Sequence, residues 1–366
     1  MPMRYVLLAL VLLALLALLP RNQQPAPASS SQDVAAPVDS EFKPPRLQTP
    51  AADDAAGMSG PDVACVPDPD DVETWPPEPT PEEKQAAIDV LSRSDLAEHQ
   101  LAAIIMGRWP GMKPFSSHDK LLALDQFVAR NPQDSIAFFS LLNTCRDFLH
   151  EAACADQRLH AGIRRLHDDN SEAWALLASY RASLNQEDAA LEALGRAATA
   201  TVSDSGIAAK LDLLERAYAA GGGFSIVQRL MLAWGDIAAE QGHWLPIYRT
   251  CKSRAESDLN WRRLCLDYAR RAERQVKTVG AEVGALALQR TLAEFSGDDD
   301  EIAAIEIRLD DVRQVIDVSS SKLLTEEAIN QAYLEAFAVG GERAALAVLA
   351  DEVARRGPAK PCPEPE

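Results

Sequence analysis

The chain has 366 residues, a net charge of −19 and a pI of about 4.8. Proteins that bind nucleic acid need a surplus of Lys and Arg to neutralise phosphate, so this composition argues against a nucleic-acid partner. The length allows one large domain or two domains of ordinary size.

The first twenty residues indicate export. Arg4 precedes an uninterrupted apolar run at residues 5–19. At about 1.5 Å per residue this run spans roughly 22 Å, less than the roughly 30 Å hydrocarbon core of a bilayer. Residues 1–20 are therefore interpreted as a signal anchor or as a cleaved signal peptide. We expect a single-pass inner-membrane protein with a periplasmic body, or a protein released into the periplasm.

Two segments rich in proline flank a body that is poor in it. Residues 21–81 hold 13 of the 23 prolines, together with many Ala, Ser, Gln and Asp residues. Such a segment has too few large apolar side chains to form a core, so it is predicted to be a disordered linker. Residues 357–366 are predicted to be a second disordered end. The folded domain is then expected at residues 82–356.

The body is predicted to be all-α. Ala, Leu, Glu and Arg dominate it, and alternation of β-branched residues is rare. Thr80, Pro81 and Glu83 form a helix-start pattern, with Thr as the N-cap and Pro at the first helical position. Break signals recur every 12–25 residues, for example at 221–223 and 340–341. This spacing is typical of antiparallel helical hairpins, stacked here as an α-solenoid.

Residues 171–198 carry small and large apolar residues at positions that suit two packed helices. The positions are Trp174, Leu177, Ala178, Ala190, Leu194 and Ala197. The segment resembles a tetratricopeptide repeat, which implies helices at 171–184 and 187–200. Small residues at 178 and 190 would allow close approach. Tyr180 departs from the pattern, because Arg181 holds the usual aromatic position. Other units match weakly, so a repeat array and a generic helical stack both remain open.

The cysteine count is even, which in an exported protein suggests disulfides. Cys145 with Cys154, and Cys251 with Cys265, each flank a predicted turn between two helices. We predict that these two pairs are bridged. Cys65 and Cys362 lie in the proline-rich ends and could pair with each other or with another chain.

One segment is basic in this acidic chain. Residues 249–277 hold nine Lys or Arg and four acidic residues, a local charge of +5. Arg263, Arg270, Arg274 and Lys277 follow helical spacing and are predicted to form one stripe. The stripe is interpreted either as a solvated face paired with Asp267 and Glu273 or as a docking surface for an acidic partner.

No pattern of catalytic, metal-binding or cofactor-binding residues stands out, and neither C-x2-C nor H-x3-H spacing occurs. We therefore expect no enzyme activity, metal or cofactor. The alternative is an envelope enzyme, or a helical arm of one, that acts on cell-wall glycan. Lytic transglycosylases use a Glu-Ser pair, which occurs here at Glu256–Ser257. The glycine and Met-Gln stretch that this family places soon after is missing.

The function expected from these features is a helical scaffold. An export signal, a long linker and a helical body suit a protein that binds protein partners in the cell envelope, because stacked helices provide extended binding surfaces.

Overall fold

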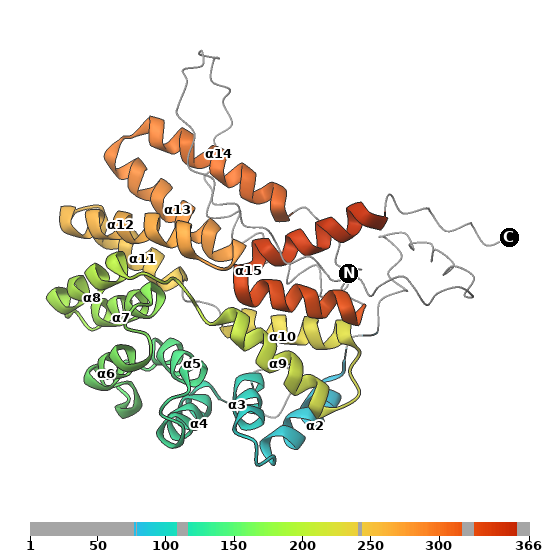
Figure 1. Cartoon of the computed structure of the whole chain (residues 1–366). Helices are drawn as coiled ribbons and strands as arrows, with labels where there is room; N and C mark the ends of the chain where they lie inside the picture. The colour runs from blue at the N-terminus through green and yellow to red at the C-terminus, as the bar shows by residue number, and fades with distance from the viewer. Residues whose placement is uncertain (1–76, 78, 108–115, 241–243, 317–325, 357–366) are drawn as a thin grey trace. The chain divides into compact units, whose positions relative to one another are not determined.

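The computed structural model describes residues 77, 79–107, 116–240, 244–316 and 326–356. These residues form fourteen α-helices and one short 3-10 helix, with no strand among them. The prediction of an all-α body is therefore confirmed (Figure 1). The helices are α2 Pro81–Ser92, α3 Ala97–Met106, α4 Ser117–Arg130, α5 Ser135–Cys145, α6 Asp156–Leu166, α7 Ser171–Ser183, α8 Glu187–Thr199, α9 Ile207–Gly221, α10 Ile226–Glu240, α11 Trp244–Ala255, α12 Leu259–Gln275, α13 Val279–Ser296, α14 Asp299–Ile316 and α15 Glu327–Arg356.

Residues 1–76 and 357–366 lie outside the described part of the chain, so the structure tests neither the apolar run, nor most of the linker, nor the tail. Within the described residues, no helix combines the length and apolar character needed to span a bilayer.

The helix start predicted at Thr80 and Pro81 is found in the structure. Pro81 occupies the first turn of α2, and the Thr80 hydroxyl accepts a hydrogen bond from the Glu83 backbone N–H. The Glu83 carboxylate in turn accepts from the Thr80 N–H at 2.7 Å, which completes a capping box. This reciprocal pairing satisfies two backbone donors that a helix start otherwise leaves open.

Helices α7 and α8 form the predicted hairpin, joined by residues 184–186. Ala178 and Ala190 are both fully buried, as the small residues at these positions predict. The departure from the repeat pattern has a local reason. Tyr180 donates a hydrogen bond to the Leu149 carbonyl at 3.0 Å, and Arg181 forms a two-pronged pair with Asp156. Both side chains therefore tie α7 to the segment around α6.

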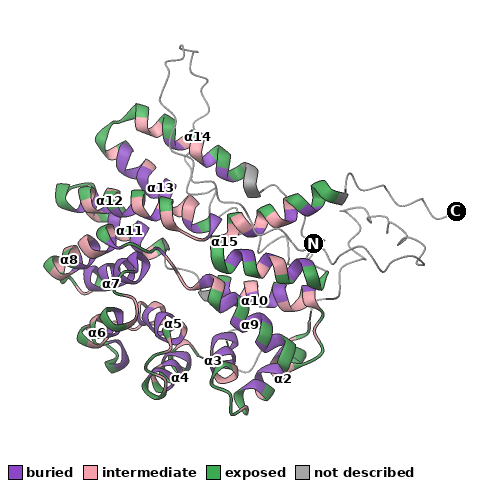
Figure 2. Ribbon diagram, in the orientation of Figure 1, coloured by how far each residue is buried: buried purple, intermediate pink, exposed green. Residues whose placement is uncertain are grey.

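Helices contact their neighbours in sequence and also distant ones. Consecutive pairs such as α4 with α5 and α12 with α13 pack together, while α2 and α3 pack on α9, α11 on α7, and α15 on α9. One large core runs through most of the helices (Figure 2). A second, smaller core lies between α13 and α14, built from Val279, Leu286, Ile305, Leu309 and Val312.

A buried ion pair fastens α2 to α9 and α10. Lys84 Nζ lies 2.6 Å from Asp236 Oδ1, and both side chains are buried. The Tyr218 hydroxyl donates to Asp236 Oδ2 at 2.6 Å. Burial raises the pKa of Asp236 and lowers that of Lys84, while their attraction opposes both shifts. Gly221 allows the close contact nearby, since a Cβ there would lie 2.9 Å from the Ala87 Cβ.

The break predicted at 340–341 appears as a sharp kink inside α15. Gly341 has φ 76° and ψ −172°, a backbone geometry that L side chains rarely adopt. A Cβ at this position would lie 2.5 Å from the Lys277 carbonyl oxygen. The Glu342 N–H donates to the same oxygen at 2.6 Å, so the kink docks against the connection between α12 and α13.

Candidate functional site

The two predicted cysteine pairs lie at disulfide distance. The sulfur atoms are 2.08 Å apart in Cys145–Cys154 and 2.05 Å apart in Cys251–Cys265. The second pair joins α11 to α12 across residues 256–258, and so holds the start of the basic helix. Cys65 and Cys362 lie outside the described residues.

The sequence of α12 separates a core face from an outer face. Asp258 caps the helix by accepting hydrogen bonds from the N–H groups of Asn260 and Trp261, at 2.7 and 3.1 Å. The core face recurs at helical spacing and is fully buried; it consists of Trp261, Cys265, Tyr268, Ala269 and Ala272. Because that face is fixed in the core, the residues between these positions must project outward.

The outer face of α12 alternates apolar and cationic residues. Leu259, Arg263, Leu266 and Arg270 stand at spacings of four, three and four residues, which places them on one side of the helix. All four line a cleft of about 250 Å³. Its remaining lining consists of Arg262 on α12, Leu292, Ala293 and Ser296 on α13, and Asp298 and Glu301 at the start of α14. We call this cleft the α12 groove.

The arginines of the α12 groove differ in what they bind. Arg262 donates to the backbone carbonyls of Ala255 and Glu256 at 2.9 and 3.0 Å, so it stabilises the turn. Arg270 lies 3.7 Å from Glu301, a loose contact between partly exposed groups. Arg263 is exposed and has no ion pair among the described residues. Positive charge is therefore available at the groove.

The acidic wall of the groove is already partly neutralised. Glu301 also lies 3.3 Å from Arg308, and Arg308 pairs with Glu273 at 2.8 Å. Sequence reasoning offered Glu273 as a partner of the basic stripe, but its carboxylate binds Arg308 and the amide of Gln289. An ion pair of the stripe with Glu273 is thus not present.

The predicted four-residue stripe is shorter than expected. Helix α12 ends at Gln275, because Val276 turns to an extended conformation and Thr278 caps the next helix. Lys277 therefore lies beyond the helix and pairs with Asp204 at 3.0 Å. Arg274 is exposed on the last turn but does not line the groove. Of the predicted residues, the structure brings Arg263 and Arg270 together at one cleft.

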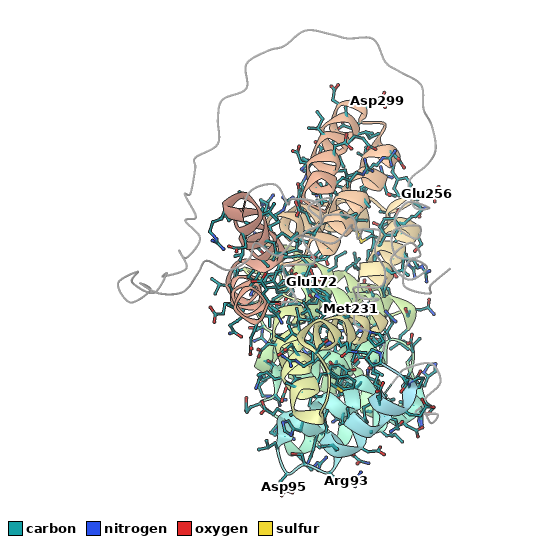
Figure 3. All side chains as sticks on the ribbon, turned by 90° about the vertical axis from the view of Figure 1, so that its right-hand side faces the viewer. Arg93, Asp95, Glu172, Met231, Glu256 and Asp299 are labelled. Atoms are coloured by element: carbon teal, nitrogen blue, oxygen red, sulfur yellow. A yellow bond between two sulfur atoms is a disulfide. The ribbon has the colours of Figure 1, made fainter. Side chains whose placement is uncertain are left out.

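Beneath the groove helix lies a buried carboxyl group. Glu172 on α7 is fully buried, and it accepts hydrogen bonds from the Ser203 hydroxyl at 2.7 Å and from the Tyr268 hydroxyl at 3.5 Å. Burial, with a smaller contribution from the nearby Asp204 carboxylate, raises the pKa of Glu172 to about 7, while the hydrogen bonds from Ser203 and Tyr268 oppose the shift. Figure 3 shows Glu172 inside the packed helices. Because Tyr268 belongs to α12, this contact ties the groove helix to α7.

The Glu-Ser pair of the enzyme alternative lies elsewhere. Glu256 and Ser257 occupy the exposed turn between α11 and α12, and Figure 3 shows Glu256 at the edge of the molecule. Neither side chain lines the α12 groove. Among the described residues, no group of three or more His, Cys, Asp and Glu side chains is placed to hold a metal ion.

Sequence reasoning found the arginines but missed the apolar half of the groove. Leu259 is 75% exposed, and Leu266 lies one turn above Arg263. The signal was present in the spacing: each of these leucines precedes an arginine by four residues. Leu292 and Glu301 could not be found in this way, because only the packing of α13 and α14 brings them to α12.

In comparisons with known proteins, no family model matches the chain, and neither a curated protein nor a solved structure matches it significantly.

Proposed function

We propose that this protein is a helical scaffold of the cell envelope that docks an acidic protein partner in the α12 groove. The observation that carries the proposal is the pairing of exposed Arg263 and loosely held Arg270 with an apolar floor in a chain of net charge −19. Leu259, Leu266 and Leu292 supply that floor. The arrangement suits a segment in which carboxylates alternate with apolar side chains.

Physical chemistry favours arginine for this task. Its planar guanidinium can make two hydrogen bonds to one carboxylate, and its weak hydration lowers the cost of desolvation. Contact between the exposed Leu259 and an apolar side chain of the partner would remove further surface from water. Charge complementarity would act at short range, since the Debye length is about 8 Å at physiological salt.

The proposal also covers the cellular location of the protein and the type of helical repeat that it contains. The apolar run at residues 5–19 and the proline-rich linker support a body displayed in the periplasm, either tethered to the inner membrane or released. The stack of helical hairpins supports a solenoid of tetratricopeptide type. Cell fractionation with protease accessibility tests the location. Recovery of the intact chain with the cytoplasmic fraction would contradict it.

A defined peptide tests the groove directly. The probe is a labelled peptide of alternating Glu and Leu, and its matched control has Gln in place of Glu. Binding to the full chain is measured by fluorescence anisotropy at low and high salt. We expect the Glu peptide to bind, its affinity to fall with salt, and the Gln peptide to bind at least about tenfold more weakly. Equal binding of the two peptides would refute an acidic ligand.

Variants separate the groove from the general charge of the helix. Arg263→Glu with Arg270→Glu should weaken binding of the Glu peptide by about tenfold or more. Arg274→Glu is the control, because Arg274 is exposed on the same helix but does not line the groove. If Arg274→Glu alone weakens binding as much as the double variant, docking is not specific to the groove.

A further inference from the structure

Helix α14 carries a surface of the kind that suits the α12 groove. It packs mainly on α13 (Figure 1). Its inner side includes Ile305, Leu309 and Val312, which belong to the small core between the two helices. Because this core fixes the inner side of α14, the positions on the opposite side of the helix face away from α13.

That opposite side combines carboxylates with apolar residues. Ala303, Ala304, Ile307 and Asp311 stand three, four, seven and eleven residues after Asp300, which places all five on one side of the helix. All five are exposed, and Ile307 has 66% of its surface exposed. No Lys or Arg stands among them. We call these five residues the α14 face.

The carboxylates of the α14 face are available to a partner. Asp300 has no ion pair among the described residues. Asp311 lies close enough to Arg343 to raise the pKa of that guanidinium. Arg343, however, already forms a two-pronged pair with Glu282 at 2.7 and 2.8 Å, so its charge is engaged. The α14 face is therefore acidic, with an exposed isoleucine between its two carboxylates.

The α12 groove has the opposite charge. Its lining holds three arginines and two carboxylates. Arg263 and Arg270 stand seven residues apart with Leu266 between them, a separation of about 10 Å along the helix axis. The two carboxylates of the α14 face stand eleven residues apart, which is about 16 Å, with Ile307 between them. The long arginine side chains can cover the difference, so charged and apolar groups alternate in matching order.

The α14 face cannot enter the groove of its own chain. Residues 292, 293 and 296 of α13 line the groove, and the α14 face lies on the side of α14 that is turned away from α13. Its occupant must therefore be another copy. The charge of −19 on each copy does not prevent this approach, because charges farther apart than about 8 Å are largely screened at physiological salt.

On the basis of the docking function proposed above, we propose that its acidic partner is a second copy of this chain, whose α14 face docks in the α12 groove. Ile307 of one copy packs on Leu259 and Leu266 of the other, and the carboxylates bind Arg263 and Arg270. Arg270 gives up only its loose 3.7 Å contact with Glu301. Since each copy has both surfaces, a twofold dimer makes this contact twice.

Sedimentation velocity with a fluorescent tracer copy tests self-association. The full chain is used, in a mild detergent that covers the apolar run at residues 5–19. We expect reversible association, weakened by about tenfold or more in Arg263→Glu with Arg270→Glu and also in Ile307→Lys. Val90→Lys is the control, because Val90 is 52% exposed on α2 and gains the same charge. A monomer at concentrations up to about 100 µM would overturn the proposal.

A mixture of the two weakened variants shows whether these two surfaces meet each other. The variant with Arg263→Glu and Arg270→Glu keeps its α14 face, and Ile307→Lys keeps its groove. Together they restore one intact contact, so the mixture should associate about tenfold more tightly than either variant alone. Circular dichroism checks that both variants fold. Association in the mixture that is no tighter than in the separate variants would contradict contact between groove and α14 face.

The Glu peptide separates this proposal from the docking function on which it rests. If the contact is as proposed, the peptide competes for the groove and dissociates the copies. If the peptide binds the groove but unmodified copies do not associate, the docking function stands and the second copy is not its partner. If the peptide does not bind and the copies do not associate, the docking function itself is refuted.

Discussion

The hairpins α7–α8 and α12–α13 use their polar residues in opposite ways. In α7, every residue from Ser171 to Ala182 is buried (Figure 2), and even Arg181 turns inward to Asp156. In α12, five residues are buried, while Arg263, Arg270 and Arg274 are exposed. The hairpin that most resembles a repeat unit therefore serves as core, and the surface proposed to bind a partner lies on a helix that resembles the repeat less.

This difference shows why the repeat pattern alone does not locate a binding surface. Its small and large apolar positions describe how two helices pack, and α7 fulfils that role on all sides. The arginines of α12 have no packing role in the pattern, so they remain available for a partner. The two hairpins meet at Glu172 and Tyr268, and changes at that contact test both regions at once.

The largest expected effect concerns Glu172. Its pKa is about 7 in the folded protein, against 4.5 for a glutamate side chain in an unfolded chain. The folded state therefore retains this proton at a pH where the unfolded state has lost it. Stability is fully present below the unfolded pKa and falls as pH rises from about 4.5 to about 7, by up to about 3 kcal/mol. Denaturant unfolding across this pH range measures the fall.

Glu172→Gln should remove that part of the pH dependence, because an amide does not titrate. The quantity to compare is the free energy of unfolding as a function of pH, measured for the unmodified protein and for Glu172→Gln. The difference between these two curves isolates Glu172, because other buried acids contribute to both. Glu192→Gln, at an exposed position on α8, is the control and should leave the slope unchanged. An unchanged slope in Glu172→Gln would contradict the view that this carboxyl is neutral in the contact between α7 and α12.

The next largest effect on stability is expected from removing the disulfides. Replacing Cys251 and Cys265 with Ala should lower the free energy of unfolding by about 3 kcal/mol, because the bridge closes a loop of 14 residues in the unfolded chain. Cys145 and Cys154, which are nine residues apart, should contribute slightly less. Peptide mapping without reducing agent checks the pairing. Free thiols at all four positions in protein from the periplasm would contradict both the bridges and the export proposal.

Much of this fold was accessible from sequence because its signals are local. The capping pattern at Thr80 and the small residues at 178 and 190 each act within one or two helical turns, and each is found where predicted. The cysteine pairs were predictable for the same reason, as each flanks one turn. Lys277 was misplaced because the end of α12 depends on the Thr278 cap, whose strength the charge spacing does not reveal.

Contacts between distant segments could not be predicted. The Lys84–Asp236 pair joins residues 152 apart in the chain, and no local pattern around either residue marks it. A cleft between the start of α5, the end of α6 and the loop before α9 was also missed, since its lining comes from separate segments that only packing brings together. Periodicity identifies the face of one helix; it does not show which other helix that face meets.

A smaller effect is expected inside α8. Ala190→Leu should cost about 2 kcal/mol, because the added atoms must enter a fully packed contact with α7. Gly195→Ala on the same helix is the control: a Cβ there meets nothing within 4 Å, so the change should be neutral or stabilise by up to about 1 kcal/mol. Thermal melting compares the two variants. An unchanged melting temperature for Ala190→Leu would mean that the hairpin is not tightly packed at this point.

The smallest effect on stability is expected at the arginines of the α12 groove, although their effect on binding should be the largest. Arg263 has no ion pair among the described residues, and Arg270 lies 3.7 Å from Glu301 in a contact in which the arginine is 46% exposed. Exposed pairs of this kind contribute roughly 0.2–1 kcal/mol. Reversing both charges should therefore lower the free energy of unfolding by less than about 1 kcal/mol, even though a second carboxylate then stands near Glu301. Denaturant unfolding at physiological salt measures this change beside Ala190→Leu. If the double reversal unfolds the protein, these arginines belong to its internal ion pairs, and the contrast between the two hairpins is wrong. If the variant keeps its stability but no longer binds the Glu peptide, the outer face of α12 is a recognition surface that folding does not require.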